Sequence, residues 1–223
     1  MMTRMFIVLL ASAGPLAFPA AQLGYASLHD LAFLTVMPSM LALATMWLVA
    51  RRRRPALARA ISRGAISGAV ATLALDAVRY TGFRLGFMPG NLPQLMGVLL
   101  LDRFALGPST ASDLAGFAYH FWNGAAFGIM FVAVAPVALA LWPMAYGVAI
   151  GVGFLVSPVV QSLGVGLFGR EFGWQFAATV LTAHAAFGIA LGALLRRFMV
   201  REQRSHGSYG LSRNACDCAC SWR

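Results

Sequence analysis

Long apolar runs separated by short polar stretches make up most of this chain of 223 residues. A helix needs roughly 20 mainly apolar residues to cross about 30 Å of hydrocarbon, because lipid offers no partner to an unpaired backbone group. The pattern predicts such segments at 28–50, 61–82, 113–134, 143–160 and 174–195. We therefore expect an all-α fold, a bundle of transmembrane helices.

The first apolar segment, 5–25, has two interpretations. It follows Arg4 and is broken by Pro15 and Pro19, and the small residues 11–13 suit a cleavable signal peptide. No polar mature N-terminus follows, which favours a retained helix and a total of six spans. Whether residues 1–25 are a retained span or a signal peptide stays open in the sequence.

A shorter apolar stretch, 92–101, lies within the connection 83–112. It is too short to span a bilayer, so we predict a re-entrant or interfacial helix. The turn residues at 86–93 favour a loop that lines a vestibule, or else an ordinary outer loop. Proline at 158 is predicted to kink the fifth span, because it removes a backbone hydrogen bond.

Composition agrees with a membrane location. Hydrophobic residues make up 60% of the chain and charged residues 11%, against about 25% charged in a soluble domain. All 17 basic residues are arginine, a bias typical of a GC-rich, bacterial genome, and the net charge is +10. The arginines gather at the ends of apolar runs, as the positive-inside rule describes, so the charge does not indicate nucleic-acid binding.

Two arginine clusters, in the loop 51–63 and the stretch 196–204, predict the orientation. Both are expected in the cytoplasm, with four spans between them and a tight cytoplasmic turn at 135–142. We therefore predict a multi-pass protein of the bacterial inner (plasma) membrane with a cytoplasmic C-terminus. Its predicted parts are an N-terminal membrane segment with the arginine-rich loop (1–60), a four-span domain (61–197) and a basic, disordered tail (198–223).

A recurring pattern of small residues suggests a duplication. His120-x3-Gly124-x3-Gly128 matches His184-x3-Gly188-x3-Gly192, and Gly64-x3-Gly68 matches Gly147-x3-Gly151. A four-residue spacing keeps these positions on one helix face. We predict two copies of a helical hairpin, 61–134 and 143–197, related by a pseudo-twofold axis along the membrane normal. The glycines are expected to let helices approach closely.

Three ionisable side chains, Asp76, His120 and His184, fall at the predicted depth of the bilayer, where a charge costs roughly 2.5–3.5 kcal/mol. Counted from the outer helix ends they lie roughly 9–15 Å deep, so we expect one polar layer. In a structural interpretation Arg79 pairs with Asp76, and each histidine is a neutral imidazole bonded across a helix interface. In a functional one the histidines bind b-type haem or a metal, or relay protons with Asp76.

The tail contains Cys216-x-Cys218-x-Cys220. Paired cysteines bind soft ions such as Cu(I), but the Cys-x2-Cys spacing of zinc sites is missing, and a disordered appendage is the favoured interpretation. The motifs of nucleotide-binding and hydrolytic enzymes are not found either. A non-enzymatic role is therefore favoured.

The runs at 119–124, Tyr-His-Phe-Trp-Asn-Gly, and at 183–188, Ala-His-Ala-Ala-Phe-Gly, resemble bacterial families of small multi-span membrane proteins of unknown function. The resemblance covers about 61–197 and implies no activity. The leading hypothesis is a protein that passes or senses a small solute or protons through the layer of Asp76, His120 and His184. The alternatives are a haem- or metal-binding electron-transfer subunit and a structural or assembly subunit, with the bilayer, a second copy or a membrane complex as partners.

Overall fold

The computed structural model describes residues 2–134 and 141–219, with side chains as far as Val200. The chain is 84% helical, and the described residues contain no strand, so the all-α prediction is confirmed. The elements in chain order include one π-helix (η1) and two short 3₁₀ turns (η2 and η3). They are α1 (Met2–Gln22), α2 (Leu28–Leu31), η1 (Ala32–Val36), α3 (Met37–Arg53), α4 (Pro55–Arg84), α5 (Leu92–Leu100), η2 (Phe104–Leu106), α6 (Thr110–Val134), α7 (Trp142–Leu155), α8 (Pro158–Ser162), η3 (Leu167–Gly169) and α9 (Trp174–Ala219).

Five helices of the described part are long and apolar enough to cross a membrane: α1, the continuous run Leu28–Arg53, α4, α6 and the Trp174–Val200 part of α9. The fifth predicted span differs from these. Its helix, α7, has 14 residues and is about 21 Å long, shorter than the hydrocarbon core. The helix is interrupted after α7. Ser157 has an extended backbone, as expected for the residue that precedes a proline, and α8 begins at Pro158. A crossing at 143–160 therefore stays a prediction that needs α7 and α8 together.

Helix α1 continues through Pro15 and Pro19, so the predicted break at these prolines was wrong. Membrane helices tolerate proline where neighbouring helices take up the freed backbone groups. Beside the first of these prolines, the Tyr119 hydroxyl of α6 donates a hydrogen bond to the Gly14 carbonyl at 2.6 Å. Helix α6 thus contacts the backbone of α1 next to Pro15.

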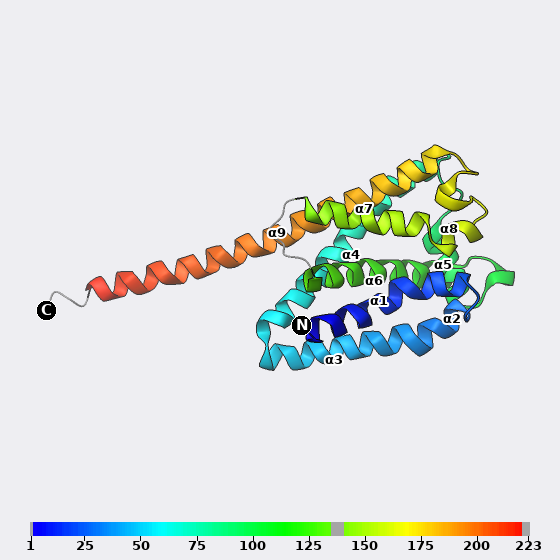
Figure 1. Cartoon of the computed structure of the whole chain (residues 1–223). Helices are drawn as coiled ribbons and strands as arrows, with labels where there is room; N and C mark the ends of the chain where they lie inside the picture. Colours follow the sequence, from blue (N-terminus) through cyan, green and yellow to red (C-terminus); the bar gives the residue numbers. More distant parts are fainter. Residues whose placement is uncertain (1, 135–140, 220–223) are drawn as a thin grey trace.

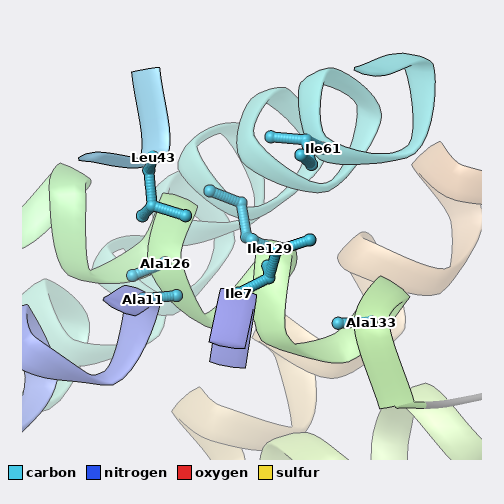
Figure 2. Close-up of a cluster of buried hydrophobic side chains, with 7 residues drawn as sticks. All are labelled: Ile7, Ala11, Leu43, Ile61, Ala126, Ile129 and Ala133. Atoms are coloured by element: carbon cyan, nitrogen blue, oxygen red, sulfur yellow. The ribbon is translucent and has the colours of Figure 1, made fainter. Parts of the chain in front are cut away.

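Side chains from α1, α3, α4 and α6 meet in one buried cluster (Figure 2). The members are Ile7, Ala11, Leu43, Ile61, Ala126, Ile129 and Ala133. Much of the remaining apolar surface is exposed, as expected for helices that face lipid tails. In this structure α1 is thus part of the bundle, and the signal-peptide interpretation stays an untested alternative.

The backbones of α4 and α6 touch at glycine. A methyl group added to Gly64 would lie 2.7 Å from the carbonyl oxygen of Gly128, and one added to Gly68 would overlap the carbonyl of Gly124. A side chain at these positions would push the helices apart. The four glycines therefore permit the close approach of α4 and α6.

The second glycine face joins α7 to α9 in a different register. Gly147 faces the backbone of Gly188, and Gly151 faces the side chain of His184. The farther glycine of the α9 motif, Gly192, faces Pro143. Since Gly68 faces Gly124 in the first hairpin, the second hairpin is displaced by one helical turn.

The predicted pseudo-twofold axis is not evident in the packing either. Helix α4 packs along α9, whereas α7 and α6, the equivalent pair under the duplication, are not among the main packed pairs of the described residues. The duplication of 61–134 in 143–197 stays a prediction from the sequence pattern.

The N-terminus, the junction of α3 with α4, and the point where α9 leaves the bundle lie at one end of the molecule (Figure 1). Helix α3 ends at Arg53, and Pro55 is the first residue of α4, a position where proline's missing N–H costs nothing. Helices α2, α5 and α8 lie at the opposite end (Figure 1). Both arginine clusters thus begin at the same end, as the predicted orientation requires.

Beyond the bundle, the backbone of α9 stays helical to Ala219 and projects away from the other helices (Figure 1). The sequence favoured a disordered tail at 198–223. Proline is absent from this stretch, so nothing in it forces the helix to stop. The side chains of Cys216, Cys218 and Cys220 lie outside the described part, as does most of the predicted turn at 135–142.

Cysteine labelling tests the orientation. In a variant whose three tail cysteines are serine, we expect Asp102→Cys to react with an impermeant maleimide on intact cells, and Arg52→Cys to react only after lysis. The two residues lie at opposite ends of the bundle, in the α5–η2 connection and at the end of α3 respectively. Labelling of Arg52→Cys on intact cells would reverse the predicted topology.

Candidate functional site

Asp76 of α4 connects two cationic or basic side chains. The His120 Nε2–H of α6 donates to Asp76 Oδ1 at 2.9 Å, and Arg79 Nη1 lies 3.5 Å from the same oxygen. The side chains of His120 and Arg79 are 12% exposed and that of Asp76 is 23% exposed. The carboxylate thus balances the arginine charge within the bundle and fixes the proton of His120 on Nε2.

His184 lies on α9 and bonds within its own helix. Its Nδ1–H donates to the Val180 carbonyl at 2.8 Å, and its ring stacks on Phe154 of α7 with centroids 6.1 Å apart. From the sequence we predicted that this histidine would bond to a neighbouring helix. The observed acceptor is instead a carbonyl of the same helix, one turn earlier. With Nδ1 occupied, the neutral ring keeps Nε2 as an acceptor.

Both histidines line one cavity of about 350 Å³ between α1, α4, α5, α6, α7 and α9. Arg79 also lines it, but Asp76 does not. The three residues of the predicted layer therefore have different positions. His120 and His184 line the cavity, whereas Asp76 lies behind His120 and is connected to the cavity by its hydrogen bond to that ring. The remaining wall is mainly apolar and aromatic, with Phe18, Met88, Leu92, Met96, Phe127, Ile150, Phe154 and Phe187 among its residues.

In two further polar side chains of the cavity wall, the side-chain oxygen lacks a hydrogen-bond partner. The Asn123 Oδ1 and Ser157 Oγ atoms are buried and unpaired, and the Asn123 side chain belongs to a residue only 8% exposed. Buried polar atoms are rarely left unpaired in proteins. Our sequence analysis did not select Asn123 as a site residue, although its position three residues after His120 on one helix face was an available signal.

A second hollow of about 400 Å³ adjoins the cavity at the end where α5 lies. The loop residues Pro89, Gly90 and Asn91 line it, as the vestibule interpretation of 86–93 expects. Met88, Leu92 and Phe154 line both hollows. These three side chains form the partition between the vestibule and the cavity.

Metal or haem ligation by the two histidines depends on which ring nitrogens are free. The described residues contain no group of three or more His, Cys, Asp and Glu side chains that could hold a metal ion. Iron ligation by His120 through Nε2 would break its 2.9 Å bond to Asp76. Ligation by His120 through Nε2 would therefore need a different ring orientation from the one observed, and the haem alternative stays a prediction.

The fold and the cavity define the class as an all-helical protein with five helices suited to a membrane. Comparison with models of known families, with curated proteins and with solved structures finds no match. The geometry of the cavity is therefore the basis on which a function can be proposed.

Proposed function

We propose that this chain is a multi-pass protein of the bacterial inner membrane that binds a small solute within the bilayer, in order to pass or sense it. The observation that supports this is the cavity of about 350 Å³ lined by His120, His184, Arg79 and the unpaired Asn123 and Ser157. An apolar pocket with a few convergent polar groups is the usual form of a small-molecule site.

The unpaired atoms give the proposal an energetic reason. A buried polar atom without a partner costs about 1–3 kcal/mol. A solute toward which Asn123 and Ser157 turn, and which supplies the missing hydrogen bonds, recovers that cost on binding. The adjoining vestibule at 86–93 supplies an approach from the outer end, with the partition of Met88, Leu92 and Phe154 as the barrier.

Proton passage is the second form of this proposal, supported by the bond between His120 and Asp76. A histidine bonded to a carboxylate is a common component of proton relays. Flux of protons into liposomes, followed with an internal pH dye and lost in His120→Phe, would favour this form. A Soret band in the purified protein that is lost when both histidines are replaced by alanine would instead favour the haem alternative.

Filling the cavity tests solute binding. We choose 2-naphthol as the probe and equilibrium dialysis against nanodiscs with and without the full-length protein. Gly153 lines the cavity, and a methyl group added there would meet nothing within 4 Å, so Gly153→Phe can extend into the open space. We expect the protein-dependent excess of bound probe to fall at least about fivefold.

The matched control places the same ring on the outer surface. Val70 of α4 is 44% exposed and does not line the cavity, so Val70→Phe is expected to keep the excess binding. Both variants are compared with the parent protein by thermal denaturation to show that they fold. Equal binding in Gly153→Phe and Val70→Phe would contradict the proposal.

A further inference from the structure

We propose that the cavity is selective for an uncharged, largely apolar molecule that carries a hydroxyl or a similar neutral hydrogen-bond donor. This inference rests on the proposed function and names the chemical class of its solute. It follows from which hydrogen-bonding atoms of the cavity wall are occupied and which are free.

The two histidines are held as opposite tautomers. His120 uses Nε2–H toward Asp76 at 2.9 Å, and His184 uses Nδ1–H toward the Val180 carbonyl at 2.8 Å. A neutral imidazole has one N–H donor and one acceptor nitrogen. Each ring has therefore spent its donor on the protein and keeps one acceptor, Nδ1 in His120 and Nε2 in His184.

Asn123 holds a third acceptor, which faces Gly14 of α1 and meets a solute only when the side chain turns toward the cavity. Its Oδ1 is buried without a partner, and its residue is more than nine-tenths buried in the cavity wall. The unpaired Ser157 hydroxyl can either donate or accept. A solute that donates hydrogen bonds thus finds two histidine acceptors, and a third in Asn123 once its side chain turns, whereas a solute with acceptors alone leaves the Asn123 oxygen unpaired.

The charges of the site cancel. Arg79 is the cationic side chain of the described cavity wall, and Asp76 lies 3.5 Å from it. An added anion would compete with Asp76 for Arg79, and an added cation would face Arg79 in a mainly apolar surrounding. An ionised solute is costly in such a site unless an opposite charge is free to pair with it. A neutral molecule avoids this cost.

Three naphthalenes of nearly equal shape, compared by equilibrium dialysis, show whether the cavity prefers a neutral donor, a neutral molecule without a donor, or an anion. The probes are 2-naphthol, which carries a donor, 2-methoxynaphthalene, which lacks it, and 2-naphthoate, which is an anion. We expect the parent protein in nanodiscs to bind 2-naphthol at least about fivefold more tightly than either of the others, the effect of about one hydrogen bond.

Substitutions of His184 and Asn123 test whether their acceptor atoms cause the preference for 2-naphthol. His184→Phe keeps an aromatic ring beside Phe154, and Asn123→Leu keeps the number and branching of the side-chain heavy atoms. Each is expected to lower the ratio of 2-naphthol to 2-methoxynaphthalene affinity toward one. The matched control is His29→Phe, since His29 bonds to the Leu100 carbonyl and does not line the cavity, and it is expected to retain the parent ratio. Thermal denaturation identifies any variant that fails to fold.

The outcomes distinguish this inference from the proposed function. Equal binding of 2-naphthol and 2-methoxynaphthalene that is lost in Gly153→Phe would overturn the donor preference and leave the solute site standing. Preference for 2-naphthoate would identify an anion site and overturn the inference. An unchanged ratio in both His184→Phe and Asn123→Leu would overturn it too. If none of the three probes binds, both proposals fail.

Discussion

Gly128→Ala is expected to lower the free energy of unfolding by about 1–3 kcal/mol, the usual cost of overpacking a tight interior. A methyl group at this position would overlap the backbone carbonyl of Gly64, which cannot move aside as a flexible side chain would. Unfolding in mixed micelles with increasing sodium dodecyl sulfate measures the change.

The control is the same substitution at a glycine with free space around it. A methyl group at Gly153 of α7 would meet nothing within 4 Å. Since glycine inside a helix costs roughly 0.5–1 kcal/mol relative to alanine, Gly153→Ala is expected to keep or raise the stability. If Gly128→Ala and Gly153→Ala had equal effects, close contact of α4 with α6 would not be the function of the glycine pattern.

Asp76→Leu is expected to lower the free energy of unfolding by about 3 kcal/mol, because it leaves the Arg79 charge and the His120 N–H without their shared acceptor. Removing both charges restores neutrality. The double variant Asp76→Leu with Arg79→Leu is therefore expected to regain most of the loss, and the double-mutant cycle measures the coupling.

An arginine five residues along the same helix provides the comparison. Arg84 lies at the exposed end of α4 and bonds to Tyr80, so Arg84→Leu is expected to change stability by no more than about 0.5 kcal/mol. Adding Arg84→Leu to Asp76→Leu should not restore the free energy of unfolding. A double variant of Asp76 and Arg79 that is as unstable as Asp76→Leu alone would show that the ion pair is not the cause.

The position of Asp76 behind His120 joins stability to the proposed function. Loss of the carboxylate frees His120 Nε2–H, so the ring can turn and offer a donor to the cavity. Asp76→Leu should therefore weaken the preference for hydroxyl-bearing probes even where the protein still folds. The same residue thus balances a charge and determines which nitrogen of His120 is the acceptor.

The sequence alone determined the approximate positions of the long helices. Every backbone group must find its partner inside the helix in lipid, so the length of an apolar run is nearly sufficient to locate a span. The boundaries moved by a few residues, as at α4, which begins at Pro55 rather than near residue 61, because proline is well suited to a first helical turn. The four-residue glycine spacing likewise identified the faces on which helices meet.

Tertiary structure decided which side chains form the site. The bond of His120 to Asp76, the unpaired Asn123 and the wall that α1 contributes depend on how each helix is rotated and displaced against its neighbour. A displacement by one turn places Gly151 against His184, whereas Gly68 meets Gly124. Local patterns in the sequence do not encode this register, because in lipid it results from the shape of both helix surfaces and their few polar contacts.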